Sequence, residues 1–220
     1  MSSVIHLLLI DNYDSFVFNA QHLFETAQPH VKVTVMRNDA PFLPLIEQGV
    51  FDGVIIGPGP GTPEDDAYFG HSKQVILHYG PKGLPVLGIC LGFQGIYHYF
   101  GGTLKKASVP IHGKVSLLDI HEPGALLGTI AQHSAVMRYH SIMADLSAPI
   151  PDCLKLTAFV AEQNAANGRE LMVLEHKEYP IYGVQFHPES FATECGFDIA
   201  RRFVSIVQQA SVALDKGCNK

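Results

Sequence analysis

One cysteine lies in a pattern that could make it a nucleophile. Cys90 stands within the segment Gly88–Gly92, which reads GICLG and joins an apolar strand pattern to a helix pattern. A nucleophile in such a strand–turn–helix elbow needs small neighbours, because a Cβ at either glycine would clash within the sharp turn. The thiol then lies at a helix N-terminus, where free N–H groups and the helix dipole favour the reactive thiolate. The pattern predicts a nucleophilic Cys90; the alternative is a buried, inert cysteine.

A histidine and a carboxylate follow a second apolar strand pattern. His187, Pro188 and Glu189 come directly after residues 181–186. Residues i and i+2 of an extended segment face the same side, and Pro188 favours an extended conformation at His187. Glu189 could then bind one imidazole nitrogen while the other faces a nucleophile, as in a catalytic triad. The alternative is a loop histidine with a chance carboxylate neighbour.

A third strand pattern is followed by a loop of alternating glycine and proline. Residues 57–63 read GPGPGTP. Proline makes such a loop rigid, and glycine lets a ligand approach the backbone closely. A phosphate-binding loop would continue with Lys and Ser or Thr, and this segment does not. We therefore expect it to form a substrate floor and to supply an oxyanion donor, together with the backbone N–H of Leu91.

The segments that must position these residues alternate between strand and helix patterns. Strands are predicted at 4–10, 31–35, 53–57 and 84–89, and helices at 16–27, 67–79 and 91–100. We expect Asp14 or Ser15 to cap the first helix. This alternation predicts an α/β fold with a doubly wound, mostly parallel sheet flanked by helices, of flavodoxin-like type. In such sheets ligands bind at the carboxyl ends of the strands, where all three signals lie.

The second half of the chain contains more strand patterns and fewer helix patterns than the first half. Strands are predicted at 114–121, 154–161, 170–176 and 181–186 with few helices between them, followed by a closing helix at 195–214. We interpret the first three as an antiparallel extension of the sheet. Since no linker or repeat interrupts the pattern, we expect a single domain over residues 1–208, followed by a polar C-terminal tail at 209–220, frayed from residue 215.

Composition excludes several classes of protein. The 220 residues are 47% hydrophobic and 16% charged, which is typical of a folded chain. A formal net charge of −6 without a basic patch argues against nucleic acid as a partner. No apolar run is long enough to span a membrane, and we expect Met1–Ser3 and the strand pattern that follows not to be a signal peptide. Four cysteines without C-x-x-C spacing indicate reduced thiols in the cytoplasm, and no metal-binding motif is found.

The same segments closely resemble a known family. Together, GICLGFQ at 88–94, GPGPGTP at 57–63 and GVQFHPES at 183–190 resemble the class I, or triad, glutamine amidotransferases. Three further segments are similar to the glutaminase subunits, or component II, of anthranilate synthase and aminodeoxychorismate synthase: DNYDSFVFN at 11–19, HGK at 112–114 and RYHSI at 138–142. The resemblance extends over nearly the whole chain.

The resemblance implies a mechanism and a partner. Cys90 would attack the side-chain amide of glutamine, His187 would hand a proton to the leaving ammonia, and Glu189 would orient His187. The family's oxyanion donors correspond to the N–H groups of Gly59 and Leu91, and its glutamine-binding positions to Gly59, Gly61, Gln94, Ser141 and Ile142. Ammonia would pass to a separate chorismate-binding synthase subunit that makes anthranilate for tryptophan or 4-amino-4-deoxychorismate for folate. No cofactor is implied here, and Mg²⁺ is expected in the partner.

Some residues depart from the family's usual pattern, and other functions are conceivable. Phe93 stands where His is frequent, Gly57 where Ser is common, and Ile142 where Leu is common. One alternative is an amidotransferase that feeds a different synthase. Another is a non-catalytic regulatory domain, which loss of Cys90, His187 or Glu189 would mark. A thiol hydrolase or peptidase of the same fold and a metal-dependent hydrolase are further alternatives. The choice between the tryptophan and folate pathways stays open.

Overall fold

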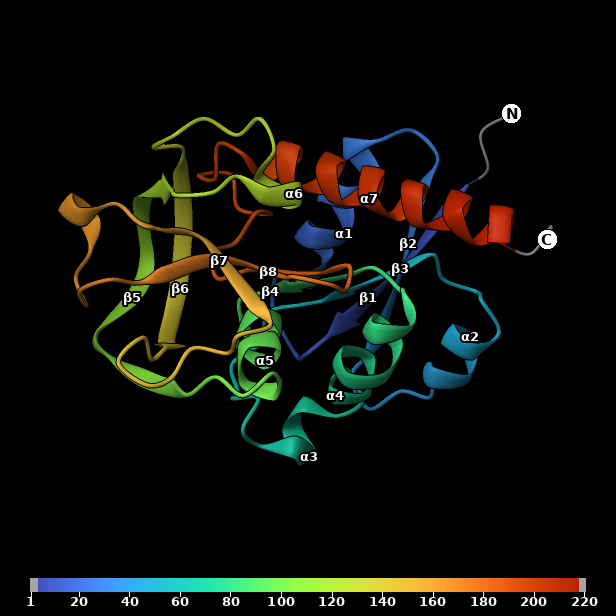
Figure 1. Cartoon of the computed structure of the whole chain (residues 1–220), viewed down its shortest axis with the longest axis horizontal. Helices are drawn as coiled ribbons and strands as arrows, with labels where there is room; N and C mark the ends of the chain where they lie inside the picture. Colours follow the sequence, from blue (N-terminus) through green and yellow to red (C-terminus); the bar gives the residue numbers. More distant parts are fainter. Residues whose placement is uncertain (1–3, 218–220) are drawn as a thin grey trace.

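A sheet of nine strands runs through the part of the chain that the structure describes, residues 4–217, of which 213–217 are described by their backbone alone. In this computed structural model the strand order is β2-β1-β3-β4-β9-β8-β7-β5-β6, with helices on both faces (Figure 1). The first five strands in that order are parallel: β2 (Val31–Arg37), β1 (Ile5–Asp11), β3 (Gly53–Ile56), β4 (Val86–Ile89) and β9 (Ile181–Val184). The predicted parallel sheet is confirmed.

The other strands extend the sheet in antiparallel fashion, as predicted. Beyond β9 lie β8 (Leu171–His176), β7 (Leu154–Val160), β5 (Leu104–Ile120) and β6 (Ala135–Ala144). The β5 strand is much longer than the predicted 114–121. The β6 strand was not predicted. It pairs with β5, and the pair forms the opposite end of the sheet from β2, at the left of Figure 1.

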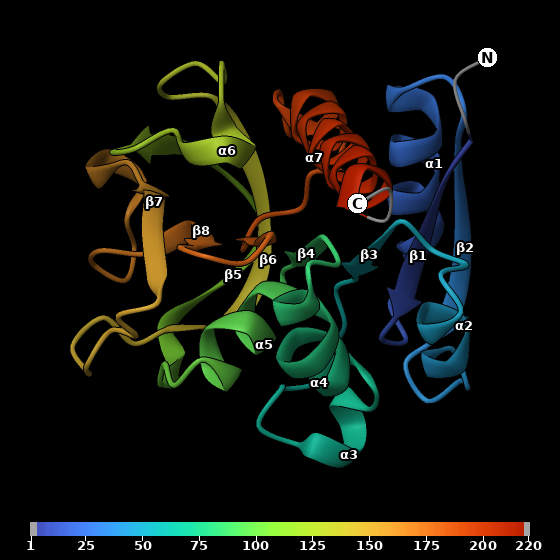
Figure 2. The same cartoon turned by 45° about the vertical axis from the view of Figure 1, so that its right-hand side comes forward.

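Helices cover the two faces of the sheet. On one face lie α1 (Val17–Ala27), α6 (Gly124–Leu127) and α7 (Gly196–Gly217); on the other lie α2 (Leu43–Glu47), α3 (Asp66–Phe69), α4 (Ser72–Gln74) and α5 (Leu91–Tyr99) (Figures 1 and 2). Shorter turns complete the connections: a π-turn η1 (Val75–Tyr79) and 3₁₀ turns η2 (Gly80–Lys82) and η3 (Glu162–Asn164).

The alternation of β1 divides the core into two layers. Successive side chains of a strand point to opposite faces. Leu7 and Leu9 therefore pack in the layer with Phe24 of α1 and Phe203 of α7, and Leu8 packs in the layer beneath α5. All of these side chains are completely buried. Burial of both faces explains why the strand reads as a continuous apolar run.

Two local predictions, the 67–79 helix and the cap of α1, differ from the structure. The expected 67–79 helix is broken into α3, α4 and η1, because Gly70 adopts a left-handed φ of 58° against the backbone of Asn38. Neither Asp14 nor Ser15 caps α1: its N-cap is Phe16, without a side-chain bond, and Asp14 instead accepts a hydrogen bond from the N–H of Phe16.

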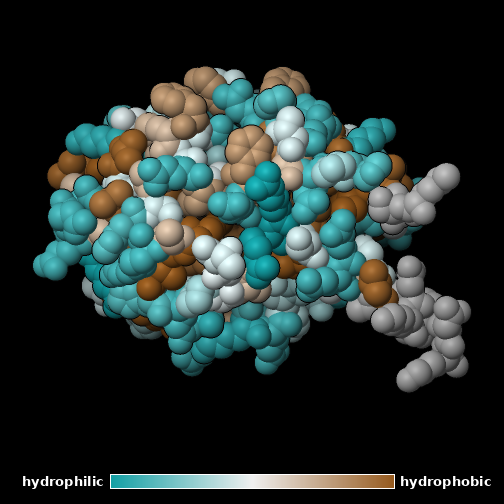
Figure 3. Space-filling model, turned by 90° about the horizontal axis from the view of Figure 1, so that it is seen from above, coloured by the Kyte–Doolittle hydropathy of each residue, from teal (hydrophilic) through white to brown (hydrophobic). Residues whose placement is uncertain are grey.

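The C-terminal helix also differs from its prediction. α7 continues past residue 214 to Gly217, so residues 209–217 extend the helix instead of forming a separate tail. The rest of the predicted tail, 218–220, lies outside the described residues. No described helix combines the length and the apolar character needed to cross a membrane. Viewed from the side of α7, the surface mixes hydrophilic and hydrophobic side chains (Figure 3).

Candidate active site

Cys90 occupies the sharp turn between β4 and α5. Its backbone has φ 52° and ψ −97°, a conformation that side-chain-bearing residues rarely adopt. A Cβ on Gly88 would lie 2.4 Å from the carbonyl carbon of Gly92, and one on Gly92 would lie 2.3 Å from the carbonyl oxygen of Ile56. Both contacts are with backbone, so a Cβ at either glycine would force a strand or helix to shift. The predicted elbow and its need for two glycines are confirmed.

His187 and Glu189 lie together beside this turn. The Nδ1 of His187 is 2.6 Å from Oε1 of Glu189, and both side chains are nearly buried. The contact was predicted, but the chain reaches it differently: β9 ends at Val184 and a turn follows at Pro188 and Glu189. The N–H of Ser190 closes this turn by donating to the carbonyl of His187.

The last antiparallel strand holds the histidine in place. The N–H of His187 donates to the carbonyl of Met137 in β6, 2.9 Å away. The hydroxyl of Thr193 donates to the carbonyl of His187 at 2.6 Å, and accepts from the N–H of Met137. The ring of Tyr139, also in β6, meets the imidazole edge-on at a centroid distance of 5.1 Å. Strand β6 therefore positions the imidazole.

The charge state of His187 depends on its two neighbours. Burial lowers the pKa of the imidazole, but the sulfur of Cys90 and the carboxylate of Glu189 raise it, and the net pKa lies well above 6.5. Among the described residues, Nε2 has no hydrogen-bond partner. An imidazolium that is anchored through Nδ1 and presents Nε2 can give a proton to a leaving group. This geometry suits acyl transfer by a cysteine.

The two residues predicted to supply oxyanion N–H groups, Leu91 and Gly59, pack against each other next to Cys90. Leu91 is the first residue of α5, where an N–H has no acceptor within the helix. Gly59 packs against Leu91: a Cβ on Gly59 would lie 2.5 Å from the carbonyl oxygen of Asn12 and 3.0 Å from Cδ2 of Leu91. The glycine is therefore needed for close approach, and the loop and the helix N-terminus meet as an oxyanion hole requires.

A cavity of about 560 Å³ opens onto these groups. Its lining includes Cys90, His187, Glu189 and Gly59, together with the side chains of Tyr13, Phe16, Tyr139 and Phe191. These four aromatic side chains are 46% to 99% exposed and form the rim. The volume is in the range of sites for small molecules.

The other predicted glutamine-binding residues do not line this cavity in the described structure: Gly61, Gln94, Ser141 and Ile142. A Cβ on Gly61 would clash with the ring of Tyr68. Gln94 is buried, and its Nε2 donates to the carbonyl of Ile142 at 2.9 Å. Ser141 is exposed in β6. Their role in holding glutamine stays a prediction.

The sequence reasoning missed one buried polar residue next to the thiol. Nε2 of Gln185 lies 3.7 Å from Sγ of Cys90. The position could have been found, because Gln185 is a polar residue within the last apolar strand pattern and stands two residues before His187. Within the described residues, no group of three or more His, Cys, Asp or Glu side chains is arranged to hold a metal ion. Cys153 and Cys195 are free thiols, as is Cys90.

Comparisons with known proteins agree with this architecture. The solved structure of a proposed GMP synthase component from Thermoplasma acidophilum superimposes with a TM-score of 0.81, covering 98% of this chain and 100% of that one. Its sequence identity is 23%, so it shows the fold alone.

Curated relatives are closer in sequence. Anthranilate synthase component 2 of Leptospira biflexa is 41% identical over 204 residues, which cover 90% of this chain and 98% of that protein. Anthranilate synthase component 2 of Saccharolobus solfataricus is 42% identical over 203 residues, covering 91% and 98%. The model of the family "Glutamine amidotransferase class-I" matches residues 8–207. The chain therefore belongs to the class I glutamine amidotransferase family.

Proposed function

We propose that this chain is the glutaminase subunit of an anthranilate synthase, and that it delivers ammonia to a chorismate-binding synthase subunit. The observation that carries the proposal is the cavity in which the Cys90 thiol, the His187–Glu189 pair and the Gly59 loop meet. The relatives named anthranilate synthase component 2 support the choice of partner, since each is matched over 98% of its length.

The reaction begins with attack by the Cys90 sulfur on the side-chain amide carbon of glutamine. A C–S bond forms, and the N–H groups of Leu91 and Gly59 stabilise the negative oxygen of the tetrahedral intermediate. The C–N bond then breaks, and His187 gives the thiol's proton to the departing nitrogen, which leaves as ammonia. Glu189 keeps Nδ1 of His187 oriented and stabilises its positive charge throughout.

The second half of the reaction restores the enzyme. A water molecule attacks the γ-glutamyl thioester, His187 accepts its proton, and the C–S bond breaks. That proton returns to the sulfur, and glutamate leaves. Gly61, Gln94, Ser141 and Ile142 hold the glutamine in this proposal, with Gly59 from the cavity lining. Because ammonia in water at neutral pH would be protonated and lost as a nucleophile, it must pass directly to the partner.

The synthase subunit determines the final product. Segments 11–19, 112–114 and 138–142 resemble both anthranilate synthase and aminodeoxychorismate synthase subunits, so one chain could serve either partner. Neither a cofactor nor a metal takes part in the steps assigned to this chain, and Mg²⁺ is expected in the partner. The curated relatives favour the tryptophan pathway.

The test is to capture the partner and identify the product. The chain would serve as bait in extract of its source, and the captured complex would receive chorismate, glutamine and Mg²⁺. Fluorescent anthranilate, identified by mass, is the expected product. 4-Amino-4-deoxychorismate would move the subunit to folate synthesis, and both products would mean a shared subunit. Release of glutamate without either product would contradict the chorismate partner but retain the glutaminase.

A further inference from the structure

The thiol of Cys90 has a second polar neighbour besides the His187–Glu189 pair. Gln185 is completely buried, and its backbone N–H donates to the carbonyl of Met172 in β8. Its side-chain Nε2 donates to Sγ of Cys90 at 3.7 Å, a distance that suits the large sulfur atom. An amide donor is neutral and does not ionise at neutral pH. It can therefore hydrogen-bond the sulfur without competing with His187 as an acid.

The orientation of this amide is determined by Gln94. An amide can point its nitrogen or its oxygen at a neighbour, and hydrogen-bond partners decide which. Oε1 of Gln185 accepts from Nε2 of Gln94 at 3.2 Å, so Nε2 of Gln185 must face the sulfur. Nε2 of Gln94 also donates to the carbonyl of Ile142 at 2.9 Å. Reversing Gln94 would place its oxygen against two acceptors, which excludes that orientation.

The carbonyl of Ile142 is held from its other side by His140. Nδ1 of His140 lies 3.1 Å from this carbonyl, and Nε2 lies 3.3 Å from Nε of Arg138. A guanidinium only donates, so Nε2 of His140 accepts and Nδ1 carries the proton. Burial and the charge of Arg138 lower the pKa of His140 to about 3, which keeps the ring neutral. The imidazole therefore has one tautomer and one orientation.

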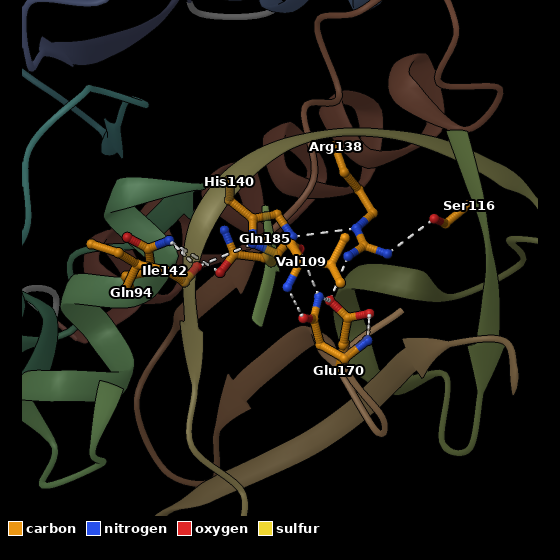
Figure 4. Close-up of polar contacts among 9 residues, drawn as sticks. Gln94, Val109, Ser116, Arg138, His140, Ile142, Glu170 and Gln185 are labelled. Atoms are coloured by element: carbon orange, nitrogen blue, oxygen red, sulfur yellow. Dashed lines mark hydrogen bonds and ion pairs between the residues drawn. The ribbon is translucent and has the colours of Figure 1, made fainter. Parts of the chain in front are cut away.

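A buried ion pair anchors the end of this hydrogen-bond network that is farthest from Cys90. Arg138 is completely buried and lies 2.5 Å from Oε2 of Glu170, with a further bond of 3.0 Å to Oγ of Ser116. Asn167 donates to both carboxylate oxygens of Glu170 and pairs with the backbone of Val109. Bonds to Glu170, Ser116 and His140 together fix the position of the guanidinium, and removing one partner of such a buried pair is strongly destabilising. Figure 4 shows this network, which runs from Val109 and Glu170 through Arg138, His140 and Gln94 to Gln185.

We propose that Gln185 is a positioning residue for the nucleophile. Its amide holds the Cys90 sulfur, and the hydrogen-bond chain Arg138–His140–Ile142–Gln94 fixes the direction in which the amide donates. The inference deepens the glutaminase function proposed above and rests on it. The buried polar side chains of this network do not line the cavity: Arg138 and His140 lie in β6, Gln94 lies in α5, and Gln185 directly follows β9.

The first experiment compares two variants of Gln185 in the full chain. Gln185→Met removes the donor and the acceptor at similar volume. Gln185→Glu keeps the shape and an acceptor for Gln94 but removes the amide donor. We expect both to lower the rate of Cys90 alkylation by iodoacetamide, read by peptide mass spectrometry, by about five- to tenfold, the size expected from one lost hydrogen bond. In the complex, kcat for glutamine should fall similarly with KM within about twofold.

A second pair of variants tests a part of the hydrogen-bond network that does not contact the thiol. His140→Leu removes the donor to Ile142, whereas His140→Asn can place its Nδ2 where Nδ1 of the ring lies. We expect His140→Leu to slow Cys90 alkylation about threefold and His140→Asn to restore most of the rate. Urea midpoints measured in parallel separate this effect from a loss of stability. The pair also keeps the test intact if the Gln185 variants do not fold.

Three outcomes would overturn the inference. One is alkylation and kcat within twofold of the native chain in both Gln185 variants. Another is a raised KM with unchanged kcat, which would make Gln185 a substrate contact. The third is a His140→Leu variant that loses stability but keeps the native alkylation rate. Because iodoacetamide needs no glutamine site, a native chain without glutaminase activity would contradict the proposed function while the alkylation series still tests the positioning.

Discussion

Oε1 of Glu189 lies 2.6 Å from Nδ1 of His187, although the two residues are separated by a proline in a turn. The short contact does not depend on distant parts of the chain, since both groups come from one tripeptide. What the rest of the fold supplies is the position of this tripeptide beside Cys90, through the bonds that His187 makes with Met137 and Thr193. The orientation of the His187 imidazole is therefore determined by its near neighbour Glu189, and its position beside Cys90 is determined by β6.

Glu189→Gln should weaken glutamine hydrolysis without abolishing it. The amide oxygen can still accept from Nδ1, but the carboxylate charge that raises the pKa of His187 is lost. We expect kcat to fall about ten- to a hundredfold, the value of a charge-assisted hydrogen bond. Glu178→Gln, which changes an exposed carboxylate, is the control. An unchanged kcat in Glu189→Gln would remove Glu189 from the mechanism.

Cys90→Ala should abolish the glutamine-dependent activity of the proposed synthase and leave its ammonia-dependent activity intact. Without the sulfur no thioester forms, so glutamine-dependent product formation by the complex should be undetectable. Ammonium salts should still support synthesis at the native rate, because free ammonia reaches the partner directly. Both activities are followed by product fluorescence. Residual glutamine use by the variant would refute Cys90 as the nucleophile.

Gly92→Ala should disturb the elbow. The new Cβ would lie 2.3 Å from the carbonyl oxygen of Ile56, so β3 or α5 must shift. We expect a loss of several kcal/mol in the free energy of unfolding and loss of Cys90 reactivity. Gly49→Ala is the matched control: it has a positive φ but open space around it, and should cost about 1 kcal/mol. Equal urea midpoints for the two variants would contradict the clash.

The described cysteines should differ sharply in reactivity. Burial raises the pKa of the Cys195 thiol to about 12, so it should resist iodoacetamide at pH 8 in the folded protein. Cys90, which lines the cavity, should react, and a glutamine analogue should protect it. Peptide mass spectrometry before and after unfolding in urea gives the comparison. Labelling of Cys195 ahead of Cys90 in the folded chain would contradict the assignment of the site.

Acid should destabilise the fold through His140. Its pKa is about 3 in the folded protein and 6.5 when unfolded, because burial and Arg138 disfavour the charged ring. Below pH 6.5 the unfolded chain takes up a proton that the folded chain does not, so stability falls as the pH falls towards 3. The contribution reaches about 4 kcal/mol at the lower end.

His140→Asn is the variant that isolates this contribution. It removes the titration, so its urea midpoint should change less between pH 7 and pH 4.5 than that of the native chain. Carboxylates and the other histidines titrate alike in both proteins and cancel in the comparison. If the urea midpoints of the two proteins changed equally between pH 7 and pH 4.5, His140 would take up its proton in the folded protein as readily as in the unfolded chain.

The sequence was informative wherever chemistry is local. The elbow around Cys90 and the pairing of His187 with Glu189 each come from a few consecutive residues, and both could be predicted from spacing alone. The buried strands could also be predicted, because a strand covered on both faces leaves a continuous apolar run.

What could not be predicted depends on pairs far apart in the chain. Strand β6 was not predicted, and it contains Arg138 and His140, whose burial is explained only by Glu170, 32 positions later, which pairs with the arginine. The break at Gly70 likewise depends on contact with Asn38, which helical periodicity does not reveal. Both failures have one cause: a polar or flexible residue was judged without its distant neighbour.

The backbone of Cys90, with its φ of 52°, has a consequence for the history of such chains. Glycine adopts positive φ without a steric cost, whereas cysteine does not. A copy of this chain released from selection for catalysis should therefore accumulate glycine at position 90 and become more stable. Retention of cysteine at position 90, despite its cost in stability, therefore distinguishes catalytically active lineages from those that have lost the activity.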